Sequence, residues 1–120
     1  MTLPRDELVL LHNPRCSKSR QAKAMLEERG VAFRERCYLE EPLSRDELRD
    51  LAARLGRPAR EWVRRKEAAF AEAGLDEEAK DGAILDAMAA HPILLERPIL
   101  VRGERARVGR PPDDLLELLD

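Results

Sequence analysis

Residues 8–20 join an apolar run to a helical pattern, and this junction constrains the fold more than any other part of the chain. The run from Leu8 to Leu11 is typical of a buried strand, and helical spacing begins near Ser17. Cys16 lies at the boundary, where a helix start offers unpaired backbone N–H groups and the positive end of its dipole. Both favour the thiolate over the thiol, and the same amides can hold an oxyanion. The junction therefore predicts a reactive cysteine beside a site for an anion.

The order of the later elements predicts an α/β fold. After the first helix, the predicted elements are a strand (31–39), a block of helices (about 44–95), a hairpin (99–101 and 105–108) and a last helix that opens at Pro111. A β-α-β unit followed by a β-β-α unit is the order of a thioredoxin-like fold with a mixed four-stranded sheet, so the middle helices are expected to be an insertion on one side. Within that insertion, Pro58 is expected to open a helix that carries Trp62 and Val63. The length predicts a single domain, residues 1–120.

Composition excludes several classes of function. Charged residues make up 38% of the chain, yet the net charge is -2, so no strong field is expected to attract nucleic acid or a membrane surface. There is no signal-like segment and no disulfide pattern, and we expect a monomeric cytoplasmic protein. The two cysteines and two histidines lack paired ligand spacing, so no metal site is expected.

The two cysteines receive different predictions. Cys16 has polar and basic neighbours, which favour a reactive thiol over a small buried hydrophobe. Cys37 shares the expected apolar face of strand 31–39 with Leu39, opposite Tyr38, so a core position is predicted for it.

The position three residues after Cys16 bears on its redox chemistry. It is Ser19, where a thioredoxin motif would place the resolving cysteine, so a thiol cycle at Cys16 needs an outside thiol such as glutathione. His12 has three open interpretations. It can stabilise the thiolate as an imidazolium, orient the loop by hydrogen bonding, or anchor the loop without a chemical role.

Arginine accounts for 18 of the 22 basic residues, and three arginines lie at element junctions: Arg64, Arg97 and Arg110. Guanidinium groups bind tetrahedral oxyanions through planar, bidentate hydrogen bonds. If these three side chains converge on Cys16, they would form a binding site for a dianion and would lower the pKa of the thiol.

Six segments together resemble one protein family. They are His12–Arg20, Tyr38–Glu40, Arg64–Lys66, His91–Leu94, Glu96–Ile99 and Gly109–Pro112. In order and with compatible spacing, they are similar to the glutaredoxin-dependent arsenate reductase family, and most closely to its short, YfgD-like branch. The likeness extends from about residue 8 to the C-terminus.

The resemblance implies a thioredoxin-like fold and a set of site residues. Cys16 matches the nucleophile, His12 a histidine that influences the thiolate, and Pro98 the cis-proline of such folds. The oxyanion would be held by the helix start, with Ser17 and Ser19, and by Arg64, Arg97 and Arg110.

The implied activity is reduction of arsenate to arsenite. Glutathione would be the co-substrate and glutaredoxin the partner, with no bound cofactor. Two alternatives stay open. One is a glutathione-dependent thiol-disulfide oxidoreductase on the same scaffold. The other is a non-catalytic regulator like the Spx-type proteins. Those proteins commonly carry a Cys-x-x-Cys switch, which this chain lacks because Ser19 stands at the second cysteine position.

Overall fold

The computed structural model describes residues 3–119 of the chain. Its elements are β1 (Leu8–His12), α1 (Ser17–Glu28), β2 (Arg34–Cys37), α2 (Arg45–Leu55), η1 (Ala59–Glu61), α3 (Ala68–Glu72), α4 (Asp81–Ala90), η2 (Pro92–Leu94), β3 (Ile99–Arg102), β4 (Arg105–Val108) and η3 (Pro112–Leu118), where η marks a 3-10 helix. The last helix is thus a 3-10 helix that begins at Pro112, directly after Pro111.

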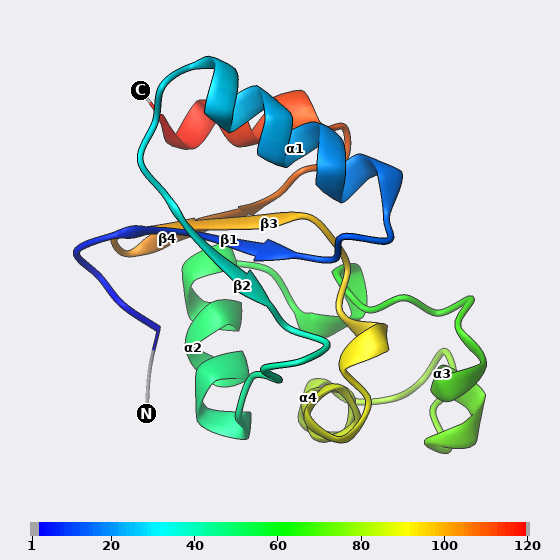
Figure 1. Ribbon diagram of the computed structural model, residues 1–120. Helices are drawn as coiled ribbons and strands as arrows, with labels where there is room; N and C mark the ends of the chain where they lie inside the picture. The colour runs from blue at the N-terminus through cyan, green and yellow to red at the C-terminus, as the bar shows by residue number, and fades with distance from the viewer. Residues whose placement is uncertain (1–2, 120) are drawn as a thin grey trace.

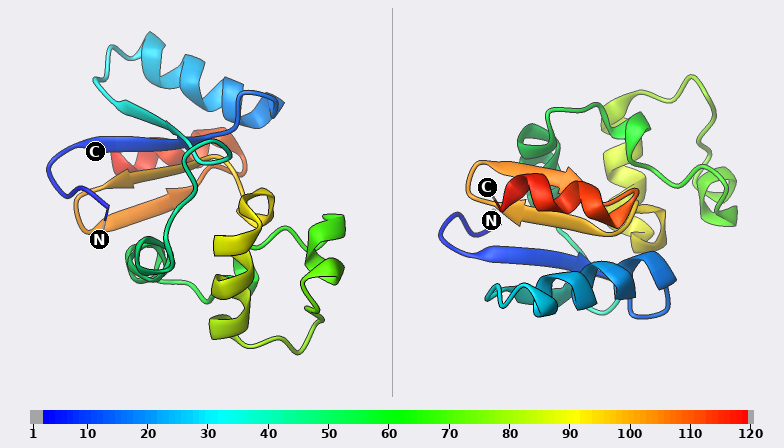
Figure 2. Two further views of the ribbon diagram at one scale, coloured as in Figure 1. Left: turned by 60° about the horizontal axis from the view of Figure 1, so that its bottom comes forward. Right: turned by 90° about the horizontal axis from the view of Figure 1, so that it is seen from above.

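The four strands form one mixed sheet in the order β2-β1-β3-β4. β1 and β2 are parallel, whereas β1–β3 and β3–β4 are antiparallel. Helix α1 and η3 cover one face, and α2 and α4 lie on the other face (Figures 1 and 2). This arrangement confirms the predicted thioredoxin-like fold with its mixed four-stranded sheet. The middle helices lie on one side of that sheet, as Figure 1 shows.

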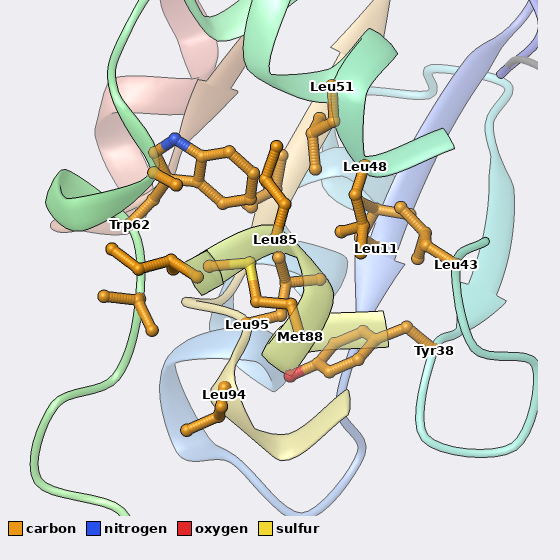
Figure 3. Packing of buried hydrophobic residues seen from close by; sticks show 14 of the residues in the cluster. Leu11, Tyr38, Leu43, Leu48, Leu51, Trp62, Leu85, Met88, Leu94 and Leu95 are labelled. Carbon is orange, nitrogen blue, oxygen red and sulfur yellow. The ribbon is translucent and has the colours of Figure 1, made fainter. Parts of the chain in front are cut away.

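Side chains of the central strands alternate between two cores. Leu10 and Leu100 pack with α1 and η3, while Leu11 belongs to the larger core on the other face. That core also contains Trp62 and Tyr38, neither of which is exposed to solvent (Figure 3). The central strands are therefore buried on both faces, which fixes their register and the position of the loop after β1.

The predicted strand 31–39 is wrong at its ends. β2 is limited to Arg34–Cys37, after which the amide of Glu40 donates to the carbonyl of Cys37 and turns the chain. Alternation does not continue through this turn, so Tyr38 is fully buried and Leu39 is exposed, the reverse of the expectation. Cys37 is only partly buried, because β2 is an edge strand of the sheet.

The expected helix from Pro58 is also wrong. Only a single turn, η1, forms, and the chain then becomes extended, so that Val63 pairs with Leu95 as an isolated antiparallel bridge. Trp62 is buried, and its indole N–H donates to the carbonyl of Arg57 at 3.2 Å. Burial of the large apolar side chains therefore favours an extended backbone over a helix at Trp62 and Val63. The extended conformation places Arg64 against the segment that leads into β3.

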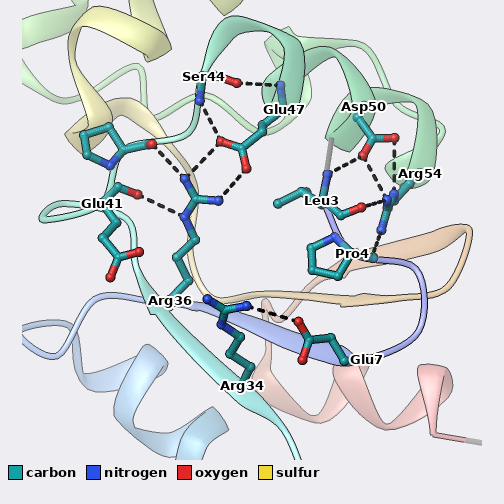
Figure 4. Close-up of polar contacts among 11 residues, drawn as sticks. Leu3, Pro4, Glu7, Arg34, Arg36, Glu41, Ser44, Glu47, Asp50 and Arg54 are labelled. Carbon is teal, nitrogen blue, oxygen red and sulfur yellow. Dashed lines mark hydrogen bonds and ion pairs between the residues drawn. The ribbon is translucent and has the colours of Figure 1, made fainter. Parts of the chain in front are cut away.

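Polar contacts attach α2 to its surroundings (Figure 4). Ser44 and Glu47 form a capping box at the start of α2: the amide of Glu47 donates to the hydroxyl of Ser44, and the Glu47 carboxylate accepts from the Ser44 amide. The same carboxylate pairs with Arg36 of β2 at 2.6 Å. At the far end of α2, Arg54 donates to the carbonyl of Leu3. These bonds hold α2 against both the sheet and the N-terminal segment.

Candidate functional site

Cys16 is the N-cap residue of the 12-residue helix α1. Its amide donates to the carbonyl of Asn13 at 3.0 Å, which closes a tight loop after β1. Burial by itself raises the pKa of the Cys16 thiol, but the backbone amides of Ser19 and Lys18 stabilise the thiolate. Together with the nearby guanidinium of Arg97, they hold the pKa of Cys16 below its ordinary value.

The buried hydroxyl of Ser19 is hydrogen-bonded to the loop that carries Cys16. It accepts from the amide of Asn13 at 3.0 Å and lies 2.9 Å from Nδ1 of His12. Ser19 is fully buried, so its hydroxyl is committed to the loop and only its amide faces the sulfur. Ser17, at the first position of α1, is exposed.

His12 links this loop to β2. Its Nε2 lies 3.4 Å from Oε1 of Glu35, whose other oxygen lies 3.3 Å from Nζ of Lys23. Burial lowers the pKa of His12, although Glu35 raises it in part, so the imidazole is neutral near pH 7. A neutral ring that donates from Nε2 to Glu35 presents a lone pair on Nδ1, which then accepts the Ser19 hydroxyl proton. The contact with Ser19 attaches His12 to the cysteine loop, and burial favours the neutral imidazole over the imidazolium.

Arg97 is the arginine that lies at the sulfur. It precedes Pro98 through a cis peptide bond, the conformation expected at this position. Because β3 pairs with β1, residues just before Ile99 lie beside the loop that follows β1, as the right-hand end of the sheet in Figure 1 shows. Arg97 is 9% exposed, and its Nε and Nη1 are buried without a hydrogen-bond partner among the described residues. A buried guanidinium with free N–H groups beside a thiolate is a place for an anion.

Arg64 and Arg110 meet at Glu96. Nη1 of Arg64 and Nη2 of Arg110 lie 3.0 and 3.2 Å from the same oxygen, Oε1 of Glu96. Nε of Arg110 also donates to the carbonyl of Arg97 at 2.8 Å. The three predicted arginines are thus linked through Glu96 and the Arg97 carbonyl. Arg97 is among the groups that lower the pKa of Cys16, while Arg64 and Arg110 are paired with Glu96.

Tyr38 is a residue of this region that the pattern analysis did not single out as functional. Burial raises its pKa to about 12, while the guanidiniums of Arg97 and Arg64 oppose that rise. Its hydroxyl has no hydrogen-bond partner among the described residues. Tyr38 is therefore a protonated phenol with a free donor close to Arg97.

Glu96 and Glu35 were also missed as members of the site. Glu96 lies inside one of the segments that carry the family resemblance, which was the only signal available. Glu35 carries no local signal of function in the sequence, because only the pairing of β2 with β1 brings it to His12.

Residues 3–119 show neither a metal-binding cluster nor a membrane-spanning helix. No three His, Cys, Asp or Glu side chains gather there in a way that could hold a metal ion. Within the same residues, no helix has the length and apolarity needed to cross a membrane.

Comparisons with known proteins agree on the relationship of this chain. Residues 11–118 match the model of the ArsC family. The arsenate reductase of Neisseria meningitidis serogroup A is 45% identical over 94% of this chain and 98% of that protein, and YfgD of Escherichia coli is 44% identical over 94% and 97%. The solved structure of an arsenate reductase from Vibrio cholerae superposes with a TM-score of 0.88 at 44% identity, covering 96% of this chain and 99% of that one. The chain belongs to the ArsC family.

Proposed function

We propose that this protein reduces arsenate to arsenite, with the Cys16 thiolate as nucleophile and glutathione as the source of the second thiol. The observation that carries the proposal is the pairing of a cysteine of lowered pKa with the free, buried N–H groups of Arg97. Similar proteins from Neisseria meningitidis and Vibrio cholerae bear the name arsenate reductase, which supports the choice of oxyanion.

In the first step, arsenate docks on the amides at the start of α1 and on Arg97. The Cys16 thiolate attacks arsenic, the new S–As bond forms, and one oxygen leaves as water after it takes up protons. Donors that face the oxyanion stabilise the charge that builds on its oxygens, an effect of about 3 kcal/mol for a single well-placed donor. Tyr38 and the Ser17 amide are further donors at the edge of this site.

In the second step, the glutathione thiolate attacks the Cys16 sulfur. The S–As bond breaks with both electrons left on arsenic, so arsenic(V) becomes arsenic(III) and the two thiols become a mixed disulfide. Glutaredoxin then attacks the glutathione sulfur and releases the Cys16 thiolate. An outside thiol is required because Ser19 cannot act as a resolving group. The cycle fits a monomer in the cytoplasm, where glutathione is kept reduced.

His12 and Pro98 have positioning roles in this scheme. His12 orients Ser19 and through it the amide of Asn13, which keeps the cysteine loop in one conformation. Pro98 sets the start of β3 and with it the backbone of Arg97.

A coupled assay tests the proposal. With glutathione, glutaredoxin and arsenate, we expect turnover that depends on all three components. The cationic surroundings of Cys16 favour a dianion over a neutral disulfide, so turnover of hydroxyethyl disulfide is expected to be slower. Efficient disulfide reduction without arsenate turnover would favour the thiol-disulfide oxidoreductase instead.

Cys37→Ala is expected to leave arsenate reduction within tenfold of the wild-type rate, which corresponds to less than about 1.4 kcal/mol. Burial, with help from Glu35, Glu40 and Glu41, raises the pKa of Cys37, so its thiol is protonated near neutral pH and is a poor nucleophile. Steady-state kinetics of the variant checks this. A larger loss would mean that Cys37 takes part in the cycle.

A further inference from the structure

Glu96 has an unusual place among the arginines of the site. A single oxygen, Oε1, accepts from Nη1 of Arg64 and from the backbone amide of Arg97, and pairs with Nη2 of Arg110. The family resemblance implies that these three arginines bind the oxyanion. The carboxylate therefore takes up donors that a tetrahedral dianion would otherwise use.

The backbone holds this acid in position. The amide of Glu96 donates to the carbonyl of Trp62 at 3.0 Å, and the amide of Arg64 donates to the carbonyl of Leu94 at 2.7 Å. Together with the bridge between Val63 and Leu95, these bonds keep the two segments antiparallel. Glu96 is thus fixed beside Arg64 by main-chain contacts, and its position does not depend on the side-chain ion pairs alone.

The three arginines consequently differ in how available they are. Arg64 is bonded to two carboxylates, since its Nε also lies 3.2 Å from Glu67. Arg110 is bonded to Glu96 and to the carbonyl of Arg97. Arg97 alone keeps buried N–H groups without a partner among the described residues. Arg64 and Arg110 thus each give N–H groups to partners within the protein, whereas the buried N–H groups of Arg97 remain available to an incoming anion.

We propose that Glu96 is a specificity-determining residue, an internal anion that competes with the oxyanion for Arg64 and Arg110. The proposal rests on the oxyanion site described under the proposed function. Its consequence is that tetrahedral dianions bind weakly before reaction, inorganic phosphate included, since a dianion must share or displace the carboxylate to reach these two arginines. Removal of the charge on Glu96 strengthens the binding of such anions.

Two substitutions distinguish competition between Glu96 and the oxyanion from a role of Glu96 in orienting the arginines. Glu96→Gln keeps an oxygen that can accept from the same donors but removes the negative charge. Glu96→Ala removes both. If Glu96 competes, both variants bind phosphate more tightly, by on the order of fivefold for a partly exposed charge in contact with the site. If Glu96 only orients the arginines, alanine weakens binding and glutamine leaves it unchanged.

The experiment measures how inorganic phosphate slows alkylation of Cys16 by iodoacetamide, with chloride at matched ionic strength as the reference. The rate against phosphate concentration gives a dissociation constant without any need for turnover. Glu104→Gln is the matched control, because it removes the same charge from the β3–β4 turn at the opposite end of the sheet. Thermal unfolding of each variant verifies that it is folded.

Competition is supported if phosphate protects Cys16 more tightly in Glu96→Gln and Glu96→Ala than in the wild type, while Glu104→Gln behaves like the wild type. Protection equal to that of the wild type, or weaker protection in Glu96→Ala alone, overturns the role of Glu96 and leaves the arsenate site standing. If neither phosphate nor arsenate protects Cys16 in any of these proteins, the oxyanion site itself is wrong, and the competition by Glu96 fails with it.

Discussion

Replacement of Cys16 with serine is expected to abolish arsenate reduction, with a loss of at least about a thousandfold in rate. A serine hydroxyl is not ionised near neutral pH, and the surroundings that lower the pKa of a thiol cannot bring a hydroxyl into that range. Serine also cannot form a mixed disulfide with glutathione. Both steps of the cycle therefore fail at once.

The coupled assay with purified Cys16→Ser protein measures this loss. Cys37→Ser is the matched control, since it makes the same atomic change at the other thiol. The fold should be unaffected, because serine is itself a favoured N-cap residue and its oxygen can accept from the same amides at the start of α1. Retained turnover in Cys16→Ser would show that another group attacks arsenic.

Arg97→Gln is expected to lower kcat/KM for arsenate on the order of a hundredfold, the usual cost of losing one donor to a developing oxyanion. The same change should raise the pKa of Cys16, because Arg97 is one of the groups that lower it. The kcat/KM of Arg97→Lys should fall between those of Arg97→Gln and the wild type, since lysine keeps the charge but lacks the planar pair of donors.

Kinetics of both variants, with Arg5→Gln as the matched control, test the assignment. Arg5 pairs with Glu104 of the β3–β4 turn at the opposite end of the sheet, so its loss removes the same charge at a distance from the site. A kcat/KM within threefold of wild type for Arg97→Gln would mean that the guanidinium does not contact the reacting oxyanion.

β1 and β3 were predictable because each is a short apolar run with a clear boundary. β2 and β4 are mostly polar, so their positions followed from alternation and from the turn at Gly103, and the bounds of β2 were missed. The position of Cys16 at a helix start followed from the same kind of local signal. These features depend on residues close together in the sequence, which is where pattern and propensity carry most information.

Other features depend on contacts between distant segments. Trp62 and Val63 look helical by spacing, yet burial of Trp62 and the bridge to Leu95 draw them into an extended conformation. Tyr38 is buried because the chain turns after β2, and no local pattern signals that turn. Such outcomes are set by tertiary packing, which overrides local preference.

The site was predictable in its members but not in their pairing. Sequence position identified Arg64, Arg97 and Arg110 as unusual arginines, but it could not show that Glu96 binds two of them while the third stays free. For His12, the choice between an imidazolium and a hydrogen-bonding role depended on burial and on Glu35, which lies on a different strand.

The most direct measurement is the pH dependence of Cys16 alkylation by iodoacetamide, made in the Cys37→Ala background so that a single thiol reacts. If the helix amides and Arg97 hold the sulfur in its charged form, the midpoint lies well below the value of about 8.5 of a free cysteine, and Arg97→Gln moves it upward. A midpoint at or above the free value, unchanged by Arg97→Gln, would contradict a thiolate nucleophile at this position.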